Sequence, residues 1–125
     1  MAAITTTTLR LGDIAHARSG DKGSSANVGV IAYKPEGYAF LQRTLTEERV
    51  AEYFKPLGPT KVTRYELPNL GALNFLLEGV LAGGGSRSLR VDAQGKALGQ
   101  AILEVELPLD GPADPAWFPD PETIP

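Results

Sequence analysis

The chain has 125 residues, 42% of them hydrophobic and 22% charged, with no cysteine and a formal net charge of −3. This length and balance predict one globular domain, and the lack of cysteine excludes disulfide scaffolds, thiolate zinc sites and cysteine nucleophiles. Twelve basic against fifteen acidic residues leave no basic footprint for nucleic acid. We find no signal-peptide pattern and no apolar window long enough to span a bilayer, so we expect a cytoplasmic chain without membrane contact.

The first half of the chain alternates between strand and helix patterns. Leu9 to Arg18 and Asn27 to Tyr33 are predicted as strands from their apolar periodicity. Pro35 suits the first turn of a helix whose apolar positions are Tyr38, Leu41 and Leu45. Thr46 is predicted to cap a second helix, whose apolar face has the spacing i, i+3, i+4, i+7: Val50, Tyr53, Phe54 and Leu57.

The second half is predicted to begin with a strand over Lys61 to Leu67. A helix is then expected over Leu70 to Leu81, capped by Asn69 and ended by the glycines 83–85. A short strand at Leu89 to Asp92 and a hairpin over Asp92 to Lys96 lead to a long strand over Ala97 to Leu107. Five prolines in the last 14 residues predict a tail without regular structure.

The resulting order, β-β-α-α-β-α-β-β, predicts an α+β fold. It lacks the strict alternation of a doubly wound sheet, so we expect a ferredoxin-like sandwich with a mixed or antiparallel sheet and helices packed on one face. The two helices before Lys61 would act as one crossover connection.

The stretch HARSGDKGSSANVG, residues 16–29, is the first candidate site. It contains the chain's one histidine, His16, which is the candidate for catalytic proton transfer because imidazole titrates near neutral pH. The spacing of a nucleotide phosphate loop is absent, so we interpret the stretch as a more general anion-binding nest or, alternatively, as a hairpin turn held by local ion pairs. The candidate anion-binding residues here are Arg18, Ser19, Asp21, Lys22, Ser24, Ser25 and Asn27.

A second cluster of donors follows the glycines, where Ser86 and Arg87 are the candidate anion-binding residues. The alternative is a helix stop followed by a solvated turn. We expect the two polar loops to lie within reach of each other. No cluster with metal-ligand spacing is present, and we predict neither a metal nor a cofactor.

Three blocks resemble the small C-terminal domain of the acyclic terpene utilisation AtuA family: LGDIAHARSGDKGSSANVGVIA, RYELPNLGALNFLLEGVL and GGGSRSLRVDAQGKALGQAILEVEL. The resemblance runs from about Leu11 to Leu107, and its most specific parts are HARSGDKG and LPNLGALNFLL. It implies a ferredoxin-fold domain, which we assign to residues 1–108. The proline-rich acidic tail over 109–125 lies outside the resemblance. The resemblance brings no established list of catalytic residues.

The resemblance also implies a function class, catabolism of terpenoid or branched acyl compounds. We expect a free-standing small subunit that completes a site for an acyl-CoA or carboxylate compound on a larger AtuA-like subunit. The alternatives are a self-contained enzyme acting on a small acyl substrate and a non-catalytic binding or oligomerisation module, so whether the chain is an enzyme stays open. Homo-oligomerisation and a small anionic ligand are further expectations. The docking surface is predicted on Leu98, Gln100 and Ile102, or on the tail.

Overall fold

The main feature of the fold is a four-stranded antiparallel sheet in the order β2-β3-β5-β4. The computed structural model describes residues 8–22, 25–80 and 97–120. The strands of the sheet are β2 (Ala15–Lys22), β3 (Ser25–Ala32), β4 (Lys61–Leu67) and β5 (Ala72–Glu78). Since β3 and β4 both run antiparallel to β5, they run parallel to each other with β5 between them. This is the split β-α-β arrangement, as expected for a ferredoxin-like sandwich.

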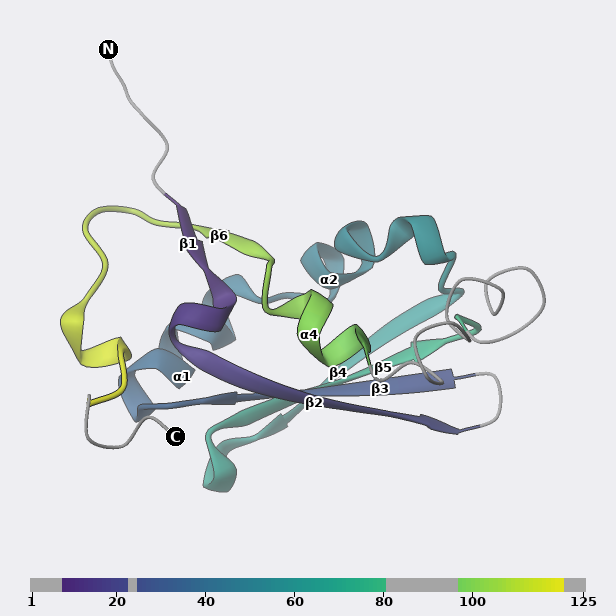
Figure 1. Cartoon of the computed structure of the whole chain (residues 1–125), viewed down its shortest axis with the longest axis horizontal. Helices are drawn as coiled ribbons and strands as arrows, with labels where there is room; N and C mark the ends of the chain where they lie inside the picture. The colour runs from purple at the N-terminus through teal and green to yellow at the C-terminus, as the bar shows by residue number, and fades with distance from the viewer. Residues whose placement is uncertain (1–7, 23–24, 81–96, 121–125) are drawn as a thin grey trace, which may run out of the picture.

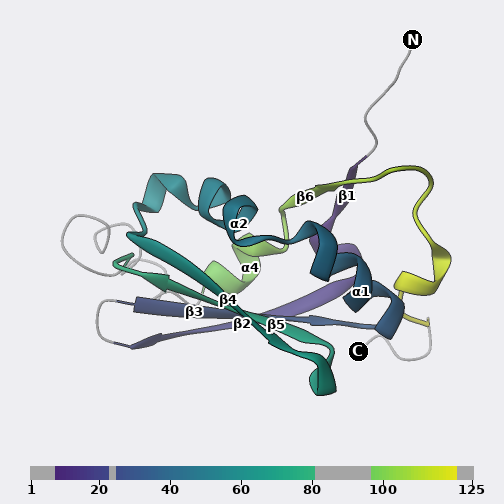
Figure 2. The same ribbon diagram turned by 180° about the vertical axis from the view of Figure 1, so that it is seen from behind.

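The helices α1 (Pro35–Thr44), α2 (Glu47–Tyr53) and α4 (Ala97–Ile102) lie over one face of this sheet (Figures 1 and 2). Helices α1 and α2 together connect β3 to β4, which confirms the single crossover. The Thr46 hydroxyl accepts a hydrogen bond from the Arg49 N–H at 3.1 Å, so Thr46 is the N-cap of α2 as predicted. Tyr38, Leu41 and Leu45 are all buried, as their helical spacing requires.

A small second sheet pairs β1 (Thr8–Arg10) with β6 (Glu106–Pro108). The predicted strand Leu9 to Arg18 is therefore wrong in one respect, because a 3₁₀ turn at Leu11–Asp13 divides it. The N–H groups of Leu11 and Gly12 donate to the carbonyls of Val105 and Leu103, away from the four-stranded sheet. These bonds hold the start of the chain to the segment between α4 and β6.

The predicted helix over Leu70 to Leu81 is wrong. Pro68–Leu70 is a 3₁₀ turn, Gly71 has a left-handed φ of 62°, and β5 follows, so Asn69 caps no helix there. Leu73, Phe75 and Leu77 are fully buried with period two, whereas Asn74 and Leu76 are half-buried on the other side. The run LNFLL fits both periodicities, and pairing with β3 and β4 on both sides decides for the strand.

The predicted strand over Ala97 to Leu107 is also wrong, since its first part is α4 and only Glu106–Pro108 is extended. Leu98 and Ile102, four residues apart, are both buried in the core. These two side chains therefore cannot form the predicted docking surface, although Gln100 between them is exposed. The predictions for 83–85, for the strand Leu89 to Asp92 and for the hairpin Asp92 to Lys96 lie outside the described residues.

The tail is not free of regular structure, because Pro115–Trp117 forms a 3₁₀ turn with Asp114 as its cap. The Trp117 ring stacks on Phe40 of α1 with centroids 4.1 Å apart, and Phe118 also packs against the core. Lys34, just before α1, pairs with Asp120 at 3.0 Å. The tail thus covers α1, which argues against its predicted use as a docking surface.

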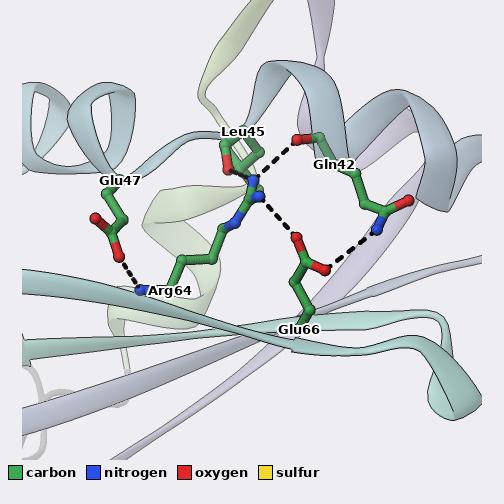
Figure 3. A network of polar contacts seen from close by, with 5 residues as sticks. All are labelled: Gln42, Leu45, Glu47, Arg64 and Glu66. Atoms are coloured by element: carbon green, nitrogen blue, oxygen red, sulfur yellow. Dashed lines mark hydrogen bonds and ion pairs between the residues drawn. The ribbon is translucent and has the colours of Figure 1, made fainter.

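The sheet and the helices are connected by Arg64 of β4 (Figure 3). Its guanidinium donates to the carbonyls of Gln42 and Leu45 at 3.0 and 2.9 Å and pairs with Glu66 at 2.9 Å. In return, the Arg64 backbone N–H donates to the Glu47 carboxylate at 2.7 Å. Arg64 of β4 thus provides hydrogen bonds to the carbonyls at the end of α1, and Glu47 of α2 accepts the N–H at the edge of β4.

We expect Arg64→Ala to lower the free energy of unfolding by about 3 kcal/mol, because two helix-end carbonyls and Glu66 lose a charged donor. Arg64→Lys should recover only part of this loss, since one ammonium cannot reproduce the guanidinium fork. Urea denaturation of both variants measures the effect, with exposed Lys55→Ala as the control. A loss below about 0.5 kcal/mol for Arg64→Ala would contradict this role.

Gly99 allows α4 to approach the backbone of β2 closely. A Cβ built on Gly99 would lie 3.3 Å from the carbonyl carbon of Arg18 and from the backbone nitrogen and hydroxyl of Ser19. The Gly99 N–H donates to this hydroxyl at 3.1 Å. By contrast, a Cβ on Gly29 of β3 would meet the Asn74 side chain at 3.7 Å, which is an ordinary contact.

Gly99→Ala is therefore expected to lower the free energy of unfolding by about 1–2 kcal/mol. The overpacking cost of about 1–3 kcal/mol falls on backbone that cannot move aside, and it exceeds the helix-propensity gain of about 1 kcal/mol. Gly29→Ala is the matched control, for which we expect no loss. Equal thermal unfolding midpoints for the two variants would show that the α4–β2 contact tolerates a methyl group.

Two tyrosines, Tyr53 and Tyr38, make the stability of the fold depend on pH. Burial raises the pKa of the Tyr53 hydroxyl, with a further increase from Glu104, and this hydroxyl donates to the Ala101 carbonyl at 2.7 Å between α2 and α4. Burial likewise raises the pKa of Tyr38, as does nearby Glu66, while Arg64 lowers it. In both cases the folded chain holds the proton to a higher pH than the unfolded chain does.

Stability should consequently be independent of these two groups below about pH 10 and fall as the pH rises above it, because there the unfolded chain ionises first. Denaturation midpoints between pH 8 and pH 11 test this expectation. A double Tyr38→Phe, Tyr53→Phe variant should show a shallower alkaline decline; a decline as steep as in the unchanged chain would assign the effect to other groups.

Candidate functional site

The face of the four-stranded sheet that carries no described helix is the candidate site, and we call it the open face. Directly paired residues of neighbouring strands point to the same side of a sheet. The register places three rows of residues across the open face, from β4 to β2. The rows are Leu67, Ala72, Ile31 and His16; Tyr65, Asn74, Gly29 and Arg18; and Thr63, Leu76, Asn27 and Gly20.

His16 and Arg18 share this face, as their spacing on one strand predicts, and both are exposed. The His16 ring lies beside the Tyr33 ring, with 5.4 Å between the ring centroids. An exposed imidazole beside an arginine can bind an anion or exchange a proton with a ligand. It is not paired with a nucleophile or a carboxylate among the described residues.

Asn27 and Ser25 of β3 also belong to the open face, and both are half-buried. The Asn27 amide donates to the Asn74 side-chain oxygen at 3.4 Å. Around this pair lies a shallow hollow of about 260 Å³, whose other walls are Tyr65 and Leu76. The hollow therefore combines amide and hydroxyl groups with an apolar wall, a composition typical of small-molecule sites.

The other predicted residues do not all join this group. Ser19 lies on the opposite side of β2, below α4, where its hydroxyl accepts the bond from Gly99. Asp21 and Lys22 belong to β2, but their side chains lie outside the described part of the structure. Ser24, Ser86 and Arg87 also lie outside the described residues, so their placement in an anion site stays a prediction.

The polar stretch is a β-hairpin, in which β2 ends at Lys22 and β3 begins at Ser25. A strand follows it, as the sequence indicated, so the element after the stretch is not a helix whose N-terminus could bind a phosphate. Leu77, near the end of β5, pairs with Ala26, so the segment after β5 leaves the sheet at the hairpin end. The second polar loop lies outside the described residues, so the mutual approach of the two loops stays a prediction.

Sequence reasoning missed Tyr65, Asn74 and Leu76 as members of the site. Asn74 and Leu76 were assigned to a helix, and on a helix they would not face β3. The alternation of Leu73, Phe75 and Leu77 with these two residues was the signal that could have found them.

Among the described residues, no group of three or more His, Cys, Asp or Glu side chains is placed to hold a metal ion. No helix in this part of the chain has both the length and the apolar character needed to cross a bilayer.

Comparison with known proteins identifies a family. The model of a family described as the AtuA ferredoxin-like domain matches residues 9–108, which is most of the chain and includes every strand of both sheets except Thr8. The chain matches no curated protein and no solved structure.

Proposed function

The chain belongs to the AtuA ferredoxin-like domain family, and from this premise we propose that it is an accessory component that docks on a larger AtuA-like partner through its open face. In this proposal the two proteins together form a site for a small carboxylate or acyl-CoA compound. The cytoplasm stays the compartment predicted from the sequence.

The observation that carries the proposal is the asymmetry of the sheet. One face is covered by α1, α2 and α4 (Figures 1 and 2). The open face carries the exposed apolar side chains of Tyr65 and Leu67 together with Arg18. Tyr65 is 49% exposed and Leu67 is 41% exposed. Large apolar side chains gathered with arginine and tyrosine are typical of protein interfaces, where burial excludes water from a few strong contacts.

The size of the face limits what it can do alone. Four strands about 4.8 Å apart, two of eight and two of seven residues, cover roughly 500 Å² of flat area. A specific interface buries about 800 Å² per partner. The open face would therefore form the centre of an interface, with the surrounding turns contributing the rest.

The chemistry of the open face favours binding over reaction. Arg18 and His16 can hold an anionic group, and Asn27 and Asn74 can hydrogen-bond a polar one. Acyl chemistry also needs a positioned nucleophile or base, and the described residues of the open face pair no nucleophile with a base. In the proposal, these reacting groups come from the partner.

A second candidate function is favoured by the adjacency of His16 and Arg18. A self-contained enzyme would hold a carboxylate on Arg18 and move a proton with His16. A third reading, a binding module without chemistry, shares the open face as its contact surface. The three readings predict different turnover: by the complex with the partner, by the chain alone, or by neither.

Copurification with a large AtuA-like protein from the same genome tests the proposal. We expect complex formation that Arg18→Ala and Leu67→Glu each weaken at least tenfold, while exposed Gln100→Glu on α4 leaves it unchanged. Arg18→Ala should change the free energy of unfolding by less than about 0.5 kcal/mol, because the side chain is exposed. A lost charge-assisted contact costs about 1.5–3 kcal/mol of binding.

Turnover of acyl-CoA substrates is expected only when both proteins are present. Steady turnover by the chain alone that His16→Ala abolishes would favour the self-contained enzyme instead. Loss of the complex in Gln100→Glu but not in the open-face variants would place the interface on the helical layer and overturn the proposal.

A further inference from the structure

A second pocket, of about 300 Å³, lies between the start of α1 and the turn that joins β4 to β5. It is separate from the open-face hollow, with which it shares no lining residue. Its walls come from the residues before and within the first turn of α1 and from the segment Pro68–Asn69–Leu70–Gly71, which is part of the motif LPNLGALNFLL. The proposed function does not use the segment Pro68 to Gly71 of this motif.

Tyr38 lines the pocket and carries an unusual hydroxyl group. The residue is 8% exposed, and among the described residues its hydroxyl is the one buried side-chain polar group without a hydrogen-bond partner. Burial raises the pKa of this hydroxyl, so it keeps its proton and stays a donor. Buried hydroxyls are almost always paired, and an unpaired one calls for an acceptor from elsewhere.

The charges around the pocket indicate a neutral acceptor. Lys34 lines the pocket, but its ammonium already pairs with Asp120, and Glu36 adds a negative charge in the first turn of α1. Glu66 also acts on the Tyr38 hydroxyl and raises its pKa, while Arg64 lowers it. A carboxylate bound at this hydroxyl would be repelled by Glu66. A carbonyl oxygen brings only a partial negative charge, which the positive end of the ten-residue helix α1 also favours.

The remaining walls combine apolar side chains with the polar Asn69. Among the described large hydrophobic residues Leu70 has the highest exposure, 68%, and Tyr33, Pro35 and Pro68 complete this apolar part. Because the Tyr38 hydroxyl is closed to solvent, a ligand reaches it only after side chains of the pocket lining rearrange. The pocket is at the small end of the range for ligand sites, which limits the ligand to a few carbon atoms around the carbonyl.

We propose that this pocket binds a small neutral carbonyl compound, an amide or ester with a short branched apolar group, whose oxygen accepts the hydrogen bond from Tyr38. Leu70 and the neighbouring prolines contact the apolar group. The proposal does not depend on the partner or on the open face, so either can fail without the other.

Titration of the ¹⁵N-labelled full-length chain with N-isobutylacetamide tests the proposal by NMR. We expect amide shifts concentrated at Lys34, Asn69, Leu70 and Gly71, with a dissociation constant on the order of 1 mM for so small a ligand. Sodium isovalerate, of similar shape but charged, should bind at least tenfold more weakly. No saturable shifts with the amide, or tighter binding of isovalerate, would overturn the proposal.

Tyr38→Phe separates a ligand-binding hydroxyl from a structural one. We expect this variant to bind the amide at least tenfold more weakly while its melting temperature stays equal or rises by about 3 °C, because an unpaired buried polar group is removed. A lowered melting temperature would mean that the hydroxyl already has a partner, such as a bound water molecule, and would overturn the proposal.

Leu70→Ala and Leu67→Ala form a matched pair that does not depend on Tyr38. Both side chains are exposed, so neither change should lower the melting temperature appreciably. Leu70 lines the pocket, whereas Leu67 belongs to the open face. Weaker amide binding in Leu70→Ala alone supports the pocket, and an equal effect of both changes contradicts it.

Discussion

The two layers of this fold depend on the exchange of hydrogen bonds between Arg64 and the crossover helices. Helix α1 ends and α2 begins within three residues, which leaves helix-end carbonyls facing the sheet. Arg64 fills this need from β4 with a guanidinium whose side chain is only 17% exposed. Glu47, from the first turn of α2, accepts the β4 N–H that an edge strand would otherwise expose. The crossover is thereby held over the β4 side of the sheet.

Because the helices cover one side of the sheet, the other side is available to bind a ligand or a partner. Alternation along each strand sends Val28, Val30 and Phe75 into the core, and the residues between them to the open face. Because Gly20 and Gly29 have no side chains, nothing projects from the open face at these positions of β2 and β3. The polar residues that the sequence concentrates between 16 and 27 are divided by the same alternation, so only some of them can touch one ligand or partner.

The C-terminal segment completes the helical layer. Two contacts hold this segment against α1. Trp117 stacks on Phe40 in the second turn of the helix, and Asp120 pairs with Lys34 at the N-cap. Its composition, rich in proline and acidic residues, is typical of a free tail, yet two aromatic side chains give it enough apolar surface to pack. The same segment neutralises Lys34 and so sets the charge preference of the neighbouring pocket.

The sequence by itself determined the fold class, the family, the crossover of α1 and α2, the Thr46 cap, and the shared face of His16 and Arg18. These features follow from local rules: helix capping, i, i+3, i+4 spacing, and side-chain alternation over a run of polar and apolar residues. They need no knowledge of what packs against the segment.

Only the tertiary structure decided the identity of β5 and α4 and the residues that share the open face. The run LNFLL satisfies helical and strand spacing alike, and its two hydrogen-bonded neighbours, β3 and β4, select the strand. The small residues of α4 fit an alternating pattern equally well, and the close approach of Gly99 to β2 selects the helix. Tyr65, Asn74 and Leu76 meet Asn27 only through strand register, and register depends on partners that are distant in the chain.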